Sequence, residues 1–148
     1  MDKTSELLLK ENKIIGEISR LYTRLDRLLK TEGSLNHVLY AIYMEENPSQ
    51  KIISEKYCIP LQTVNNTVHS LVKKGYLKLV ENESDRRQKI IAFTEAGRNF
   101  AKENVEKVIS IEKAAIEKVG IENYSRMIET EENYRRALNE EIENRFSE

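Results

Sequence analysis

The sequence predicts a mainly α-helical protein with one small β-hairpin. Apolar residues recur at the i, i+3, i+4, i+7 spacing of an amphipathic helix in several long segments. One region departs from this spacing, because two short runs of β-prone residues flank a polar loop between residues 76 and 93. The composition is 39% hydrophobic and 33% charged, with five glycines and two prolines, which is typical of a soluble, helix-rich chain.

Two helices are predicted before residue 47. The first continues to a break near Gly33, and its apolar positions are Ile14, Ile15, Ile18, Leu21, Tyr22, Leu25, Leu28 and Leu29. The second begins with Asn36 as its N-cap, and Leu35 just ahead of the cap is expected to contact Tyr40 as a hydrophobic staple. Its apolar stripe consists of Val38, Leu39, Ile42 and Tyr43.

A third and a fourth helix follow the sequence Asn47-Pro48-Ser49. Ser49 is expected to cap the third helix, whose inner face holds Ile52, Ile53 and Tyr57. The fourth helix runs from Leu61 to Lys74 and ends at Gly75, since glycine tolerates the positive φ found just past a helix end. Its apolar side consists of Val64, Val68, Leu71 and Val72, and its polar side of Gln62, Asn65, Asn66, His69 and Lys73. Two short helices with a tight turn between them, the second with a polar outer face, form a helix-turn-helix.

The hairpin makes this unit a winged helix-turn-helix. Its strands are expected at Tyr76–Val80 and Lys89–Phe93, and the polar loop between them carries Arg86 and Arg87. Thr94 then caps a long helix that ends at Gly120, and a last helix carries Tyr124, Met127, Ile128, Tyr134, Leu138, Ile142 and Phe146. Narrow apolar stripes flanked by dense charge are typical of helices that pair. The partner of these stripes is the first helix, a second copy of the chain, or both.

The charge is distributed unevenly along the chain. Residues 1–50 hold 7 Lys/Arg and 8 Asp/Glu, residues 51–98 hold 9 and 5, and residues 99–148 hold 8 and 12. The three segments therefore carry −1, +4 and −4, although the net charge of the chain is only −1. The positive charge coincides with the winged unit, which favours a polyanionic partner for that unit.

Other classes of protein lack support in the sequence. No apolar run approaches the roughly 20 residues of a membrane span, and the N-terminus lacks the features of a secretory signal. Cys58, the one cysteine, cannot form an internal disulfide, which favours a reducing cytoplasm; we expect it to be a small buried hydrophobe rather than a redox sensor. Motifs of an enzyme, a cofactor or a metal site are missing as well, so no catalytic residue is assigned.

Taken in order, these motifs resemble the MarR family of bacterial transcriptional regulators. The resemblance rests on Ile59-Pro60-Leu61-Gln62-Thr63-Val64-Asn65, Leu71-Val72-Lys73-Lys74-Gly75-Tyr76-Leu77, Asp85-Arg86-Arg87 and Phe93-Thr94-Glu95-Ala96-Gly97. It implies a cytoplasmic homodimer that acts as a repressor on a pseudo-palindromic operator in double-stranded DNA. The implied organisation is an N-terminal dimerisation helix at residues 1–34, a DNA-binding domain at 35–96 and C-terminal dimerisation helices at 97–148. Pro60 departs from the family, which often has Ser or Asn at this cap, and leaves the register of the fourth helix open.

The resemblance and the residue types together give candidate site residues. The candidates for DNA contact are Gln62, Thr63, Asn65, Asn66, His69, Lys73, Arg86, Arg87 and Lys89, with Lys51 as a further phosphate contact. Asp85 is expected to pair with Arg87 and to stiffen the wing. The dimer is expected to use Tyr134, Leu138 and Ile142, which recur at i, i+4 and i+8.

A small phenolic or aromatic effector is a further implication. Its pocket is expected to involve Tyr22, His37, Tyr40 and Tyr43, which offer apolar walls with hydroxyl and imidazole groups. These tyrosines could equally fill the core with their hydroxyl groups at its edge. The polar face of the fourth helix could likewise be a solvated surface, and a winged helix can serve as a protein–protein interaction module without DNA binding.

Overall fold

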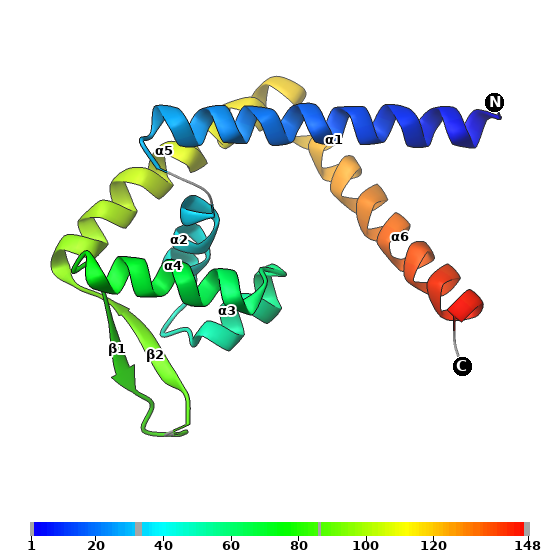
Figure 1. The fold of residues 1–148 in the computed structure, drawn as a ribbon. Coiled ribbons are helices and arrows are strands. Elements are labelled where there is room, and N and C mark those ends of the chain that lie inside the picture. The colour runs from blue at the N-terminus through cyan, green and yellow to red at the C-terminus, as the bar shows by residue number, and fades with distance from the viewer. Residues whose placement is uncertain (1, 32–33, 86, 147–148) are drawn as a thin grey trace. The chain divides into compact units, whose positions relative to one another are not determined.

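The computed structural model describes residues 2–31, 34–85 and 87–146. Figure 1 shows their elements in chain order: α1 (Lys3–Leu28), α2 (Leu35–Met44), α3 (Gln50–Tyr57), α4 (Leu61–Lys73), β1 (Leu77–Glu81), β2 (Lys89–Phe93), α5 (Glu95–Val119) and α6 (Ile121–Phe146). The strands β1 and β2 pair in an antiparallel hairpin. The prediction of a mainly helical winged helix-turn-helix fold is therefore confirmed.

The chain forms two compact units, Met1–Glu106 and Lys107–Glu148. The first contains α1 to α4, the hairpin and the beginning of α5, and the second contains the rest of α5 and all of α6. In the first unit, α3 and α4 contact each other, and both contact α2. In Figure 1 the hairpin follows the end of α4 and projects away from these three helices.

The core of the first unit is built from the apolar faces of α2, α3, α4 and the hairpin. Apolar periodicity places these residues inside, because burial of each large aliphatic side chain contributes roughly 1.5–3 kcal/mol. The largest fully buried side chains are those of Leu39, Ile42, Ile53, Leu71, Leu77, Ile91, Val38, Val64 and Val68. Burial of the apolar face of α4 therefore fixes which of its residues point outward.

Three local signals in the sequence act as predicted. Ser49 caps α3, since its Oγ accepts a hydrogen bond from the Ile52 N–H (3.2 Å). Gly75 ends α4 with a φ of +77°. Thr94 caps α5, because its Oγ1 accepts a hydrogen bond from the Gly97 N–H (3.0 Å).

Two boundaries and two burial predictions are wrong. Asn36 lies inside α2 rather than at its cap, because its amide donates to Asp26 of α1 and to Thr31, while Ser34 precedes the helix. The first helix ends at Leu28, before the predicted break, and Gly33 lies outside the described residues. Ile52 is 44% exposed, because the short helix α3 buries only the neighbouring Ile53.

Cys58 is exposed, in contrast to its predicted place in the core. It is the C-cap of α3 and has left-handed backbone geometry (φ 52°, ψ 37°), which turns the chain toward α4. The apolar side chain buried at this turn is the next one, Ile59, which is 4% exposed.

The base of the hairpin is joined to the helices on either side. Thr94 Oγ1 donates to the carbonyl oxygens of Gly75 (2.7 Å) and Tyr76 (3.2 Å), and the Thr94 N–H also donates to Tyr76 O (3.0 Å). The ring of Tyr76 stacks on Phe100 of α5 with 4.4 Å between the centroids. On the other side, the Ile91 N–H donates to Pro48 O (2.8 Å), and Ser49 forms a β-bridge with Ile90.

Candidate nucleic-acid interface

The outer face of α4 presents the predicted polar residues. Gln62, Asn66, His69 and Lys73 are exposed, whereas Thr63 and Asn65 are half-buried. The helix exposes this face because Val64, Val68 and Leu71 are buried on the opposite one. Amides and imidazoles on such a face can donate to and accept from the base edges of a major groove.

Two of these side chains contact each other. Gln62 Nε2 donates to Asn66 Oδ1 across one turn of α4, with 2.9 Å between the atoms. The spacing of four residues places both amides on the same face of the helix. The structure therefore joins two of the predicted contact residues into a pair.

The wing loop is ordered by short-range hydrogen bonds of acidic and amide side chains. Asp85 Oδ1 accepts from the Arg87 N–H (3.0 Å), and the carbonyl oxygen of Asp85 accepts from the Gln88 N–H (3.0 Å). Asn82 Oδ1 accepts from the Ser84 N–H (3.0 Å) in the same loop. Asp85 thus acts on the backbone of Arg87, and its carboxylate holds the turn. The other predicted tip residue, Arg86, lies outside the described residues.

Exposed cations also lie on the hairpin and on α3. The side chains of Arg87 and Lys89 are exposed on the hairpin, and Lys51 is exposed on α3, where it pairs with Glu55 (3.7 Å). Three further cations that were not predicted as contacts, Lys74, Lys78 and Arg98, are also exposed. The alternation of β1 would have identified Lys78, because its neighbours Leu77 and Leu79 point toward the protected side. The guanidinium of Arg98 lies 5.7 Å from the centre of the Phe93 ring.

A polar cluster connects the end of α2 to the last turn of α3. Glu45 accepts from Lys56 Nζ (2.7 Å) and from the Tyr57 hydroxyl (2.8 Å). The hydrogen bond from Lys56 is the largest cause that lowers the pKa of the Glu45 carboxyl, and the Tyr57 hydroxyl adds to it. Burial, followed by the neighbouring carboxylate, raises the pKa of Tyr57 to about 12. The cluster holds α3, which packs against α4, in a defined position.

The predicted effector residues lie in different surroundings. Tyr40 packs edge-on against Tyr57 (6.4 Å between centroids), and the hydroxyl of Tyr43 reaches Glu106 (3.5 Å). His37 is exposed, and Tyr22 on α1 is 45% exposed. The partners of Tyr40 and Tyr43 differ, and these contacts fit a place at the edge of the core.

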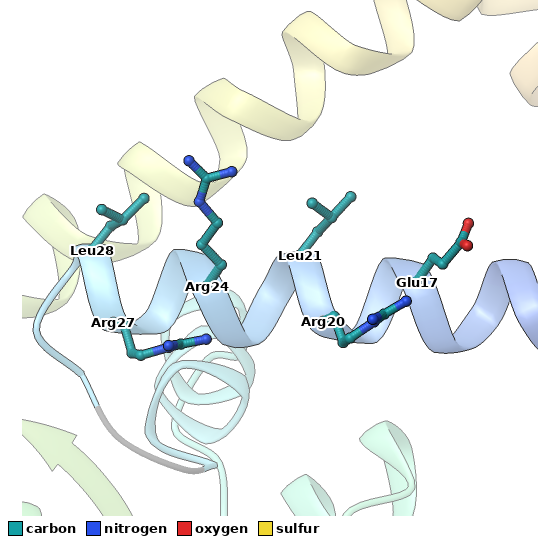
Figure 2. Close-up of a pocket in the computed structure, with 6 residues that line it drawn as sticks. All are labelled: Glu17, Arg20, Leu21, Arg24, Arg27 and Leu28. Atoms are coloured by element: carbon teal, nitrogen blue, oxygen red, sulfur yellow. The ribbon is translucent and has the colours of Figure 1, made fainter.

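A pocket of about 790 Å³ lies along α1 and has a different lining. Its residues are Glu17, Arg20, Leu21, Arg24, Arg27 and Leu28. Figure 2 shows that all six belong to α1 and that Leu21, Arg24 and Leu28 project to the same side of the helix. The lining combines three guanidinium groups with two leucines, a chemistry suited to an organic anion with an apolar body.

The predicted dimer residues form an exposed stripe on α6. Tyr134, Leu138 and Ile142 are each nearly half exposed. None of the residues in α1 or α6, all of which are described, is buried. Long helices with exposed apolar stripes are typical of surfaces that another helix covers.

The described residues lack two kinds of feature. No helix in this part of the chain has both the length and the apolar character needed to cross a membrane. The same residues contain no group of three or more His, Cys, Asp or Glu side chains that could hold a metal ion.

Comparison with known proteins gives a family match for part of the chain and a shared fold. Residues 37–88 match the sequence model of the MarR family. The structure is similar to that of a MarR family regulator from Neisseria meningitidis, with 23% identity, a TM-score of 0.77, and coverage of 98% of this chain and 99% of that one. A search of curated proteins found no match.

Two further similar structures were solved with bound molecules. The MepR–DNA complex from S. aureus has 17% identity and a TM-score of 0.71, over 93% of this chain and 99% of that one. The PcaV transcriptional regulator from Streptomyces coelicolor, in complex with its natural ligand, has 15% identity and a TM-score of 0.68. The match covers 84% of this chain and 91% of that one.

Proposed function

We propose that the chain, whose residues 37–88 match the sequence model of the MarR family and whose fold is that of a solved MarR family regulator, is a sequence-specific DNA-binding transcriptional regulator. In this proposal it binds a pseudo-palindromic operator as a cytoplasmic homodimer and acts as a bacterial repressor. Each α4 enters a major groove, and each wing enters the neighbouring minor groove. The MepR–DNA complex, which has the same fold, supports DNA as the partner.

One observation carries the proposal. The exposed face of α4 is rich in amides, and the exposed cations Arg87 and Lys89 stand on the hairpin that follows it. Amides discriminate between base edges, whereas cations attract phosphates irrespective of sequence. A surface used only for protein contacts would not need both chemistries side by side.

The dimer is the part of the proposal that sets the spacing of the half-sites. Exposed Tyr134, Leu138 and Ile142 of α6 supply an apolar stripe for a second copy of the chain. The exposed leucines and isoleucines of α1 supply another. Two-fold symmetry in the protein then requires two-fold symmetry in the operator.

Release by a small aromatic or phenolic effector is the regulatory part of the proposal. The PcaV structure with its natural ligand supports a ligand-binding role for this fold. The arginines and leucines of the α1 pocket suit an aromatic acid better than a neutral phenol, since guanidinium groups pair with carboxylates. Calorimetry with aromatic acids checks this part: a ligand that weakens DNA binding must itself bind the DNA complex more weakly by the same factor. Binding that DNA leaves unchanged would remove the effector from the proposal.

The DNA-binding part is tested by fluorescence anisotropy with DNA from upstream of the gene and with random DNA of equal length. We expect tighter binding to the upstream DNA, and an affinity that falls steeply as salt increases. Equal affinity for the two DNAs would contradict sequence recognition. No binding to either at low salt would favour the alternative, a module for protein contacts.

A further inference from the structure

The exposed face of α4 carries two amide side chains that are bonded to each other. Gln62 and Asn66 are both exposed, so packing against other elements does not force their contact. We propose that the two amides read DNA as one unit with a fixed polarity. This inference rests on the DNA-binding function proposed above and concerns how that surface selects its sequence.

The hydrogen bond decides which atoms remain for DNA. A primary amide has two N–H hydrogens and two oxygen lone pairs. The contact occupies one hydrogen of Gln62 and one lone pair of Asn66. Gln62 keeps its whole carbonyl oxygen as an acceptor, and Asn66 keeps both amino hydrogens as donors. The pair therefore presents an acceptor at its first residue and a donor at its second.

This order matches specific groups in a major groove. The Gln62 oxygen accepts from the amino group of adenine or cytosine, and the Asn66 nitrogen donates to N7 of a purine, O6 of guanine or O4 of thymine. Four residues of helix rise about 6 Å, and base pairs are stacked about 3.4 Å apart, so the two amides reach base pairs one or two steps apart. An isolated amide could rotate and exchange its donor for its acceptor. Each bonded amide can do so only if it breaks the contact.

Two charged substitutions test the polarity. In Gln62→Glu the carboxylate cannot donate, so Asn66 must turn its amino group toward residue 62 and present its oxygen to DNA. Selection of binding sites from randomised duplexes should then show a changed preference at the base that faces Asn66. The wild type should select a base that presents an acceptor there, and the variant a base that presents an amino group. Asn66→Asp still accepts from Gln62, so the preference at the base facing Gln62 should persist while the other one is lost.

A double-mutant cycle tests whether the two residues act as a unit. Gln62→Ala and Asn66→Ala should each weaken binding to the selected site by about tenfold, the lower part of the range for a lost base contact. The affinity of the double variant for the selected site should also fall by on the order of tenfold rather than a hundredfold, because either change alone disorders the pair. The control cycle combines Gln62→Ala with His69→Ala, seven residues or about 10 Å further along the helix, where the effects should multiply.

The outcomes are distinct. Non-multiplicative losses in the first cycle, together with the changed base in Gln62→Glu, would support the pair. Multiplicative losses in both cycles, or an unchanged base preference facing Asn66 in Gln62→Glu, would overturn it and leave DNA recognition intact. A wild-type chain that enriches no sequence would overturn the proposed function and this inference with it. Circular dichroism of each variant ensures that only folded protein is compared.

Discussion

The substitution Gly97→Ala should destabilise the first unit strongly, because Gly97 lies directly against the base of the hairpin. A Cβ at this position would stand 1.7 Å from Tyr76 O, 2.5 Å from Tyr76 C and 2.8 Å from Tyr76 Cα. Ordinary contact begins at 3.4 Å, so the peptide of Tyr76 or the start of α5 must move by about 1.7 Å. The neighbour is backbone and cannot swing aside as a flexible side chain can.

The structure gives the size of the loss. The Tyr76 oxygen accepts from the Thr94 N–H (3.0 Å) and the Thr94 hydroxyl (3.2 Å), and both bonds break when it moves that far. Two hydrogen bonds contribute about 1 kcal/mol each, and the stacking of Tyr76 on Phe100 contributes about 1 kcal/mol more. We therefore expect the free energy of unfolding to fall by about 3 kcal/mol, a large part of the roughly 5–15 kcal/mol that stabilise a typical domain.

Urea unfolding followed by circular dichroism measures this loss, at one fixed protein concentration because a dimer is stabilised by mass action. Gly16→Ala is the matched control. Gly16 lies inside α1, and a Cβ there meets nothing within 4 Å, so alanine should stabilise the helix by up to about 1 kcal/mol. If Gly97→Ala changes the free energy of unfolding by less than about 0.5 kcal/mol, the close approach to Tyr76 does not constrain the hairpin and the reasoning is wrong.

Three further predictions concern the cluster on α3, the wing and the dimer. Tyr57→Phe should lower the free energy of unfolding in urea by about 1 kcal/mol at pH 8. This difference from the wild type should vanish as the pH rises from 10 toward 12, because the folded protein keeps the Tyr57 proton up to a pKa of about 12. A difference that does not depend on pH would contradict this. Arg87→Ala should weaken DNA binding and reduce the slope of log affinity against log salt by about 1, whereas an unchanged slope would remove this side chain from the interface. Truncation after Gly120, which deletes α6, should abolish operator binding and give monomers in sedimentation; an intact chain that is itself monomeric at micromolar concentration would refute the dimer.

Much of the fold could be predicted because its signals are local. Ser49, Gly75 and Thr94 mark helix ends through their own backbone and side-chain chemistry, and the structure uses each as expected. The polar face of α4 follows from the helical spacing of its apolar and polar residues alone. The contact between Gln62 and Asn66 also joins residues only four apart, so their spacing would have been sufficient to suggest it.

The wrong predictions concern residues whose position depends on contacts that the local sequence does not encode. Asn36 has the side chain of an N-cap, but it bonds to Asp26 in the preceding helix, and no periodic pattern encodes that pairing. Cys58 follows the half-buried Tyr57 and precedes the buried Ile59, yet the turn requires a positive φ at its position and directs its thiol to solvent. In the candidate site, Asp85 was predicted to pair with Arg87, but the sequence did not indicate that its carboxylate would accept from the Arg87 backbone N–H. The pocket on α1 was not predicted, although its six lining residues lie on one helix at helical spacing.

The pairing of β2 with the turn before α3 bears on how the protein avoids aggregation. A two-stranded sheet leaves a row of unpaired N–H and C=O groups on each outer edge, and such edges are templates for strands of other chains. Here the Pro48 carbonyl occupies the N–H of Ile91 on the outer edge of β2, and proline has no N–H through which to extend the sheet further. The other outer edge belongs to β1, which has only five residues and carries the exposed charge of Lys78. A hairpin that projects from the helices is thus poorly suited to recruit a strand of another chain.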